Sequence, residues 1–522
     1  MPETLALTML APLALVPVIL LALARPGKRP GALPLLSELS ALAALGLALA
    51  GLVQTALASS PGVSLGAGAL AFGLRADLVA ASMGALVGFI GWIVMRYSRT
   101  YLDGESREGA FHGLMLATLA AVLVFVQAAT LPTLIASSFA VGLTLRKLLL
   151  FYPDRPEAQR AAAKFARVWY AGDVMLACAA GLLFSKFGTL DVTALPAAAA
   201  TGGLGFAGTL GIAAIVTAAA LKTAAFPLHG WLTEVMEAPT PVSALLHAGI
   251  INSGGVLLIT AAGLVQQSTG AMAALVMIGG FTALFGAAVM LTQSAIKTAL
   301  AWSTVSQMGF MLLQCGLGLW SLALLHIIAH SLYKAHAFLS SGTAVTEVSN
   351  IRRPGPVAVP SVGAVIKSFA LALGIFIAIA AAFTAALGPK SPQALALGAI
   401  LIFGVAYLVA QGLAGRAPAA LTTRTITAAL AAAIGYFSFQ AIAAKLWGPI
   451  LPQAPVPGAL EWALIVVAVA SFGLVAFAQA LFPLWAHHPA TAGLRVHLAN
   501  GLYLNALLDR WIGGFRTNTA AR

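Results

Sequence analysis

The sequence predicts an all-α protein that crosses a membrane about 14–15 times, because apolar stretches of the roughly 20 residues that a crossing helix needs recur along the whole chain. The mean hydropathy is +0.96, and 60% of the 522 residues are hydrophobic whereas only 8% are charged. A soluble protein has to cover its surface with polar groups, so this composition excludes a soluble globular protein. The apolar runs lack the period-two alternation of a membrane barrel, and lipid cannot satisfy an open backbone. The crossing elements must therefore be helices.

The predicted spans are the apolar blocks that few charges interrupt. They cover residues 4–25, 33–53, 77–96, 111–128, 130–150, 166–185, 206–226, 241–265, 270–292, 297–316, 320–345, 361–386, 392–414, 424–446 and 459–483. We expect residues 1–486 to form this helix bundle. The more polar segment 487–522 is expected to form a tail at the cytoplasmic surface, too short for a second soluble domain.

The net charge of +13 reports orientation and not a nucleic-acid partner, because the basic residues are scattered through short loops and form no continuous patch. An N-terminus placed outside puts most Lys and Arg residues in cytoplasmic segments. The main clusters are then residues 25–29, 96–107, 146–167 and the tail from Arg495. The acidic start of the chain does not resemble a cleavable signal, so residues 4–25 are expected to be the first span.

The two cysteines, Cys178 and Cys315, both fall inside predicted spans. Neither their number nor their spacing supports a disulfide framework or a metal site. We therefore expect no metal and no cofactor in this chain.

Residues 221–249, LKTAAFPLHGWLTEVMEAPTPVSALLHAG, place titratable groups on both sides of a predicted helix break. A lysine near the centre of a span costs about 2.5–3.5 kcal/mol, so Lys222 is expected to have a role or a partner. Pro227 should break the helix just beyond it, which is tolerated only where protein or water meets the freed backbone. We expect a hydrated cavity at Lys222, with His247 six residues inside the next span. Structural pairing of Lys222 to Asp173 is the alternative.

A second group lies in residues 326–338, HIIAHSLYKAHAF. His326, His330 and Lys334 are spaced four residues apart, which places them on one helix stripe about 12 Å long. Imidazole has an ordinary pKa of about 6.5, and burial can lower a lysine pKa towards that range. The pattern predicts a proton relay. Packing and interhelical hydrogen bonding remain alternatives, above all for His247 on its own.

Three further residues are weaker candidates for the relay. His229 and Glu237 lie in the segment that connects the two spans, where Glu237 can also serve as an interfacial residue that holds the loop. Lys367 lies six or seven residues into its span and could instead extend to the surface.

The motifs resemble the proton-translocating, antiporter-like subunits of respiratory complex I and of Mrp-type cation antiporters. The matching stretches are KTAAFPLHGWLTEVMEAPTPVSALLHAG (222–249), IKTALAWSTVSQMGFM (296–311) and LHIIAHSLYKAHAFLSSG (325–342), joined by Asp77 and RYSRTYLDGE (96–105). The resemblance covers roughly residues 75–345, and it implies an antiporter-like core of about residues 75–387 with broken helices and inverted repeats. Within the family, LLLFYPDRPEAQRAAAKF (148–165) is closest to the DabB subunits of inorganic carbon uptake systems.

The resemblance also assigns roles by motif. It implies a proton relay through Lys222, His247, His326, His330, Lys334 and the Asp173 of a GD motif. One position departs from the family, because the glutamate that normally partners the lysine would fall at Phe139. Asp173 is then the candidate counter-ion of Lys222, and Lys367 is offered on position alone for the family's twelfth-span lysine.

As a whole, the resemblance implies a transport subunit and not an enzyme, placed in the cell inner membrane with its C-terminal tail in the cytoplasm. The expected function is proton or cation conduction in an energy-coupled inorganic carbon uptake complex. The implied partner is a large cytoplasmic DabA-like protein that resembles a zinc β-type carbonic anhydrase, so catalysis and zinc are expected there; the other contacts are membrane lipid and H+ or Na+. The alternatives are a proton-pumping or Na+/H+ antiporter subunit of a complex I-like or Mrp-type complex, and a non-conducting scaffold.

Overall fold

A computed structural model describes residues 6–57, 63–65, 71–342, 361–412, 419–485 and 488–511. The outer ends of the predicted spans 4–25, 320–345 and 392–414 lie outside the described residues. So do tail residues 487 and 512–522.

Helices make up nearly all of the described fold. The α-helices are α1 (Val16–Ala24), α2 (Leu33–Leu57), α3 (Leu78–Tyr101), α4 (Glu108–Val126), α5 (Leu131–Leu149), α6 (Pro156–Phe187), α7 (Leu195–Gly202), α8 (Gly205–Lys222), α9 (Gly230–Thr233), α10 (Thr240–Ala248), α11 (Ser253–Thr260), α12 (Ala262–Val265), α13 (Thr269–Met290), α14 (Ile296–Gly316), α15 (Trp320–Leu339), α17 (Val362–Leu387), α18 (Pro392–Gly412), α19 (Ala419–Trp447), α20 (Ala459–Trp485), α21 (Pro489–Ala499) and α22 (Leu504–Trp511). Short 3-10 helices are η1 (Leu7–Leu10), η2 (Leu13–Leu15), η4 (Val235–Glu237), η5 (Ile250–Asn252) and η6 (Gly501–Tyr503). The strands β1 (Val63–Leu65) and β2 (Phe72–Leu74) form a small antiparallel hairpin that was not predicted.

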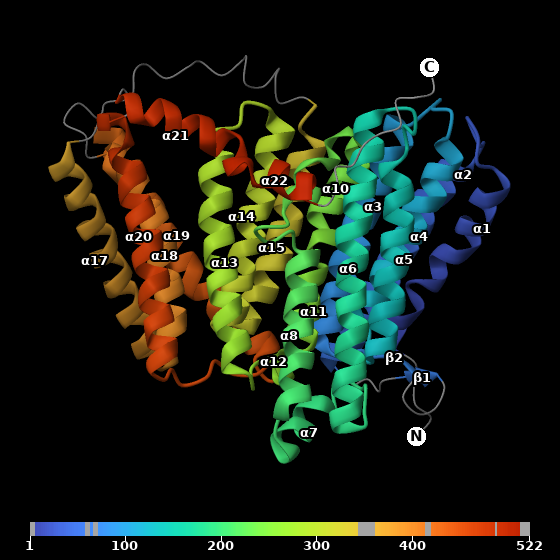
Figure 1. The fold of residues 1–522 in the computed structure, drawn as a ribbon, viewed down its shortest axis with the longest axis horizontal. Helices are drawn as coiled ribbons and strands as arrows, with labels where there is room; N and C mark the ends of the chain where they lie inside the picture. The colour runs from blue at the N-terminus through green and yellow to red at the C-terminus, as the bar shows by residue number, and fades with distance from the viewer. Residues whose placement is uncertain are drawn as a thin grey trace.

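Among the described residues, twelve helical segments are long and apolar enough to cross a membrane. Helices α5, α14 and α18, with 19, 21 and 21 residues, lie among them and reach about 30 Å at a rise of about 1.5 Å per residue. The helices stand roughly parallel to one another and form a bundle several helices wide and more than one helix deep (Figure 1). The prediction of an all-α polytopic membrane fold is therefore confirmed, whereas the inverted repeats stay a prediction.

The bundle has a central body and two flanking groups. Helices α3 to α15 form the body, α1 and α2 pack on its side against α3 and α4, and α17 to α20 gather on the opposite side (Figure 1). The indole nitrogen of Trp447, at the end of α19, donates to Ser82 on α3 over 3.2 Å. The last helices, α21 and α22, return across one end of the bundle towards its middle.

Two of the central helices are broken. Helix α8 ends at Lys222, and its freed carbonyl at Leu221 accepts a hydrogen bond of 3.2 Å from the indole of Trp231. The freed amide of Phe226 donates to the hydroxyl of Thr282 over 3.1 Å. Protein groups therefore satisfy the backbone at this break, as an interruption at membrane depth requires. The second break separates α10 from α11 at Gly249 and the 3-10 turn η5.

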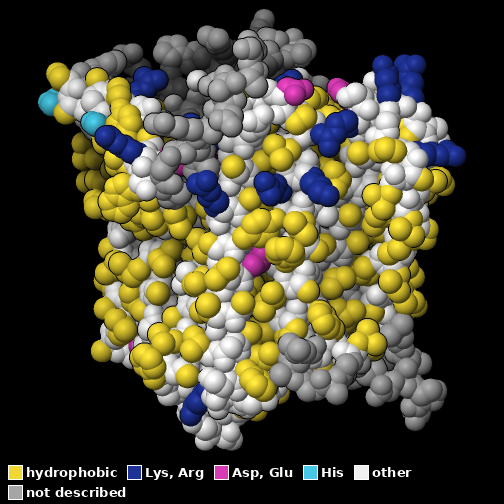
Figure 2. Space-filling model, turned by 45° about the vertical axis from the view of Figure 1, so that its right-hand side comes forward, with side chains coloured by type: hydrophobic (Ala, Val, Ile, Leu, Met, Phe, Trp, Pro, Cys, Tyr) yellow, Lys and Arg dark blue, Asp and Glu magenta, His cyan; other side chains and the backbone are white. Residues whose placement is uncertain are grey.

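Lys and Arg side chains gather at one end of the bundle. The amide of Gly109 bonds to the carbonyl of Gly27, and Arg107 donates to the carbonyls of Leu150 and Phe151, so the basic clusters at 25–29, 96–107 and 146–167 meet. Figure 2 shows most Lys and Arg on this end, which also carries α21. The segments that the sequence assigns to the cytoplasm thus share one face.

Candidate functional site

Lys222 lies in a compact polar cluster at the end of α8. Its ammonium is 2.7 Å from the carboxylate of Asp173 on α6 and donates to the hydroxyl of Ser138 on α5 over 2.6 Å. Ser138 in turn donates to the same oxygen of Asp173 over 2.6 Å. The ammonium also lies 4.0 Å from the ring centre of Trp169. Lys222 is fully buried and Asp173 is 7% exposed, so the positive charge is balanced by a carboxylate, a hydroxyl and a π face.

Helix α6 builds most of this cluster from one short stretch. Trp169 and Asp173 are four residues apart, so they share one helix face. A Cβ added at Gly172 would meet the Cγ and Cε atoms of Lys222 at 3.3 Å, tighter than most such contacts. The glycine of the GD motif therefore leaves room for the lysine side chain, and the aspartate that follows supplies its charge partner.

The structure settles the question raised by Phe139. The Phe139 side chain is 48% exposed on the outer surface of α5, where it packs against Tyr170. Its neighbour Ser138 points inward to Lys222. The residue that meets the lysine from α5 is thus Ser138, and Asp173 is the counter-ion, as expected.

A second cluster joins His247 on α10 to Lys334 on α15. His247 shares a hydrogen bond of 3.1 Å with the hydroxyl of Thr304, and its ring stacks on Phe338 with centres 4.3 Å apart. Thr304 and Lys334 both donate to the carbonyl of Leu300, over 2.9 and 3.2 Å. His247 and Lys334 are fully buried. Among the described residues, no carboxylate lies within ion-pair distance of Lys334.

The predicted stripe on α15 continues from Lys334 to His330 and His326. The two imidazole rings lie edge to face with their centres 6.2 Å apart. His326 shares a hydrogen bond of 2.8 Å with Gln314. Neither nitrogen of His330 has a hydrogen-bond partner among the described protein groups, although the residue is only 5% exposed. The stripe thus places three basic groups along one buried helix face.

Two small cavities adjoin the helix break at Gly249. The first, about 20 Å³, is lined by Ser138 and Trp169 of the Lys222 cluster and by Gly249 at the break after α10. The second, about 10 Å³, shares Gly249 and is lined by Asn252 and Ser331. One water needs about 10–15 Å³, and most of the remaining lining is apolar. Protein groups surround the Lys222 ammonium, and the cavity beside its cluster has room for about one water, so the hydrated cavity at Lys222 stays a prediction.

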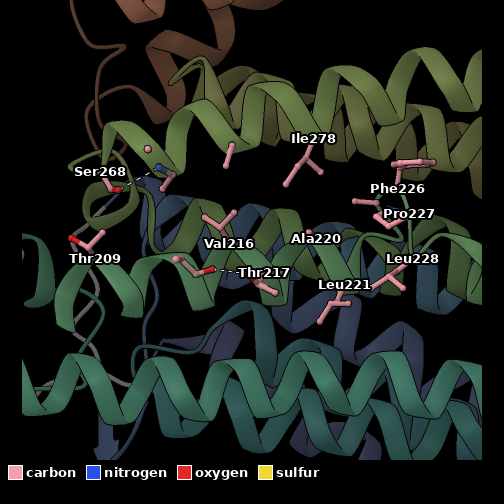
Figure 3. A pocket seen from close by; sticks show the side chains of 15 residues that line it. Thr209, Val216, Thr217, Ala220, Leu221, Phe226, Pro227, Leu228, Ser268 and Ile278 are labelled. Carbon is pink, nitrogen blue, oxygen red and sulfur yellow. Dashed lines mark hydrogen bonds between the residues drawn. The ribbon is translucent and has the colours of Figure 1, made fainter. Parts of the chain in front are cut away.

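A larger cavity lies elsewhere. It measures about 370 Å³ and runs between α8 and α13, from Thr209 and Ser268 at one end to Pro227 at the other (Figure 3). Its lining is mainly apolar, and Leu221 contributes to it whereas Lys222 faces α6 on the other side of the helix. This groove has no ionisable lining residue and so cannot carry the relay.

His229 lies outside the spans in an aromatic box. It is 1% exposed, and its ring centre is 4.9 Å from that of Trp302 and 5.6 Å from that of Phe285. Burial lowers the pKa of His229 to about 4, and the nearby ammonium of Lys164 adds to the shift. The structure gives this imidazole no direct contact with the Lys222 cluster.

The two remaining candidates lie at the surface. Glu237 pairs with Arg155 at 3.2 Å, and both side chains are about half exposed, which fits the interfacial interpretation. Lys367 is exposed on α17, in the outer helix group. Its assignment to the buried relay is therefore not supported, and the position fits the surface alternative.

Sequence reasoning missed several partners of the buried groups. They are Ser138, Trp169, Thr304 and Gln314. For Trp169 a signal existed, since it stands one helix turn before Asp173. The others are ordinary polar residues within spans. In the described residues, no group of three or more His, Cys, Asp or Glu side chains could hold a metal ion.

Comparisons with known proteins agree with this architecture. Residues 137–358 match the family described as "NADH:quinone oxidoreductase/Mrp antiporter, TM". A solved structure of the Mrp complex from Dietzia sp. DQ12-45-1b aligns with a TM-score of 0.61 and 23% identity, covering 98% of this chain and 61% of that one, so it shows the shared fold.

Two curated relatives are closer in sequence. "Probable inorganic carbon transporter subunit DabB2" of Halothiobacillus neapolitanus is 37% identical over 91% of this chain and 86% of its own length. "Probable inorganic carbon transporter subunit DabB" of Hydrogenovibrio crunogenus is 42% identical over 53% of this chain and 54% of its own.

The bundle, its broken helices and its buried lysines thus define an antiporter-like membrane subunit. The 37% identity to the DabB2 subunit, which extends over most of both chains, narrows this class further. The chain belongs to the family of DabB inorganic carbon transporter subunits.

Proposed function

We propose that this chain conducts protons across the cell inner membrane as the membrane subunit of an energy-coupled inorganic carbon uptake complex. One observation carries the proposal: the fully buried Lys222 is bonded at once to Asp173 and Ser138. A lysine and an aspartate in a membrane bundle are expensive, which makes a functional role their default interpretation. Family membership supports the same conclusion, since the relatives are named as inorganic carbon transporter subunits.

The hydroxyl of Ser138 suits proton exchange within the first cluster. It accepts from the Lys222 ammonium and donates to the Asp173 carboxylate, each over 2.6 Å. A proton can therefore leave the lysine for the carboxylate through the hydroxyl, with every step inside hydrogen-bond distance. The second oxygen of Asp173 has no partner among the described protein groups and can pass the proton on.

The second cluster would continue the route. Lys334 and His247 are joined through the Leu300 carbonyl and the Thr304 hydroxyl, and the stripe extends to His330. Transfer between the clusters has to cross the two small cavities at Gly249, so it requires a rearrangement that admits water there. The break between α10 and α11 supports such a rearrangement, because the helix has no continuous hydrogen-bond ladder at this point.

The end rich in Lys and Arg would face the cytoplasm under the positive-inside rule. Proton entry would then supply about 2.3 kcal/mol per charge per 100 mV. In this proposal, a large cytoplasmic DabA-like partner resembling a zinc carbonic anhydrase carries out the hydration of CO2. The proton current makes that reaction run in one direction.

A second candidate function is proton pumping or Na+/H+ exchange within a complex I-like or Mrp-type assembly. The match to the oxidoreductase/Mrp family and the Mrp-like fold favour it. A neighbouring gene that encodes one large soluble zinc protein would support carbon uptake. A run of six or more membrane-subunit genes supports the second candidate.

The decisive experiment is co-expression of the chain with the neighbouring soluble gene in cells that lack carbonic anhydrase. Growth in air should be rescued, and an uncoupler that collapses the proton gradient should abolish the rescue. Rescue that persists with the uncoupler would contradict energised uptake. Lys222→Ala and Lys334→Ala should each abolish rescue at normal membrane abundance, whereas a non-conducting scaffold would tolerate both.

A further inference from the structure

The C-terminal helix α22 forms ion pairs with the first turns of α6, the helix that also carries Asp173, the partner of Lys222. Asp509 on α22 pairs with Arg160 at 2.6 Å and with Lys164 at 2.7 Å. Glu234, beside α9, pairs with the same two cations at 3.3 and 2.9 Å. The side chains of Lys164 and Asp509 are 7% and 8% exposed. Two acids and two bases from three segments thus form a charge-balanced quartet, which we call the tail quartet. Arg160 and Glu234, with side chains 46% and 21% exposed, form its outer part.

Asn505, one helix turn before Asp509, presses α22 onto α9. Its side chain bonds to both Lys164 and Glu234. A Cβ added at Gly230 would overlap the side-chain oxygen of Asn505 and come within 2.9 Å of the Lys164 ammonium. A side chain at position 230 would therefore force Asn505 and Lys164 to move from their present places.

The residue after Gly230 connects this contact to the proton site. Trp231 donates to the carbonyl of Leu221, the residue before Lys222. Its ring centre lies 6.3 Å from that of Trp169, whose face carries the Lys222 ammonium at 4.0 Å. An unbroken series of contacts thus runs from α22 through Gly230 and Trp231 to both the backbone and the ammonium of the lysine.

We propose that Asp509 and Asn505 are positioning residues for Lys222. By holding α9 against α6, they fix Trp231, and Trp231 fixes the end of α8 and the ring beneath the ammonium. The inference rests on the proposed function, since it assigns to the tail a role in the proton step. It gives the cytoplasmic tail a direct mechanical link to the buried site.

The first test uses the close approach at Gly230. In membrane vesicles from cells that express the full chain with its neighbouring subunit, proton uptake is followed with a pH-sensitive dye and normalised to the amount of protein. Gly230→Ala should displace α22 and lower uptake by about tenfold or more, because small misplacements at a reacting centre have large effects. Gly230→Ala combined with Asn505→Ala should have the rate of Asn505→Ala alone, because both changes disrupt the same contact. Unchanged uptake in Gly230→Ala, or a double variant whose loss is the product of the two single losses, would overturn the proposal.

The second test separates positioning from a general loss of structure. Asp509→Asn keeps the shape and removes the charge that holds Arg160 and Lys164 together. It should move the midpoint of the pH profile of uptake, because it alters the surroundings of the Lys222–Asp173 pair. Asp509→Glu should restore the wild-type profile, and Asp154→Asn, at an exposed acid before α6, is the matched control. A lower amount of protein with an unmoved midpoint would show a purely structural role.

Lys222→Ala distinguishes failure of the proposed proton conduction from failure of the positioning role. Uptake that survives Lys222→Ala contradicts the proposed function itself. Loss of uptake in Lys222→Ala, with wild-type rate and midpoint in Gly230→Ala and Asp509→Asn, overturns the positioning role alone. If Gly230→Ala does not accumulate in the membrane, Asn505→Ala replaces it, since it needs no extra room, and a wild-type rate and midpoint in that variant would overturn the role.

Discussion

The two buried lysines of this protein differ in what balances their charge. Lys222 has a carboxylate at 2.7 Å, a hydroxyl and an indole face. Lys334 has the carbonyl of Leu300 and the ring of Tyr333, and among the described residues no carboxylate lies within reach. The difference teaches that two lysines of similar burial can be accommodated in two ways: Lys222 by a counter-ion and a hydroxyl, and Lys334 by a backbone carbonyl and an aromatic ring.

The largest effect on stability is expected where a charge loses its partner. Asp173→Ala leaves the Lys222 ammonium buried without a carboxylate, which costs about 3–5 kcal/mol, and it should abolish proton uptake. The free energy of unfolding can be compared by heat-induced loss of monodisperse protein in detergent. Replacing both partners, as Lys222→Met with Asp173→Leu, should recover stability without recovering uptake. If Asp173→Ala were as stable as the wild type, the Lys222–Asp173 pair would not form in the membrane.

Removal of the second lysine should separate function from stability. Lys334→Met keeps the volume and leaves no opposite charge unpaired, so we expect a stability change of about 1.5 kcal/mol or less. Proton uptake should nevertheless be lost. The same two measurements apply, with Asp173→Ala as the reference. A destabilisation as large as that of Asp173→Ala would mean that a carboxylate pairs with Lys334 after all.

His229 is a buried basic group that forms no ion pair with a carboxylate among the described residues. Burial lowers its pKa to about 4, against an ordinary value of about 6.5. Between these two pH values, His229 binds a proton in the unfolded chain but not in the folded chain. Its contribution to the free energy of unfolding is therefore fully present above about pH 6.5 and is lost as the pH falls towards 4. His229→Phe keeps the ring contacts and should reduce the loss of melting temperature between pH 7 and pH 5. Equal acid sensitivity in wild type and variant would contradict this origin.

The smallest effect is expected at Lys367. Its side chain is exposed on α17, so Lys367→Ala should change stability by no more than about 0.5 kcal/mol. Proton uptake should equal that of the wild type at matched protein amounts. Impaired uptake would return Lys367 to the list of relay members.

The membrane fold could be predicted from sequence because length and hydropathy suffice to locate helices in lipid. The pairing of Lys222 with Asp173 could also be anticipated, since each charge in a span needs a partner and the GD motif supplied one. Ser138 could not, because a serine inside a span is unremarkable until the rotation of α5 is known. The departure at Phe139 drew attention to the wrong side chain for the same reason.

Other features depend on contacts between distant segments. The break after Lys222 suggested water, but Trp231 and Thr282 satisfy the freed backbone, and no local pattern reveals either partner. The tail quartet and its neighbour Asn505 join α6 to residues more than 300 positions away, so a polar tail could be predicted but not the place where it docks. The carbonyl partner of Lys334 likewise follows only from how α14 and α15 pack.

The two small cavities at Gly249 also bear on the leakage of protons through the membrane. A membrane that stores energy as a proton gradient is short-circuited by any permanently wetted file of water. Here the two cavities that share Gly249 are lined mainly by apolar side chains and have room for about one water each. Hydrophobic constrictions can gate a pore by losing their water. Under the proposed function, a lining of this kind would limit proton current to the intervals in which water fills these cavities.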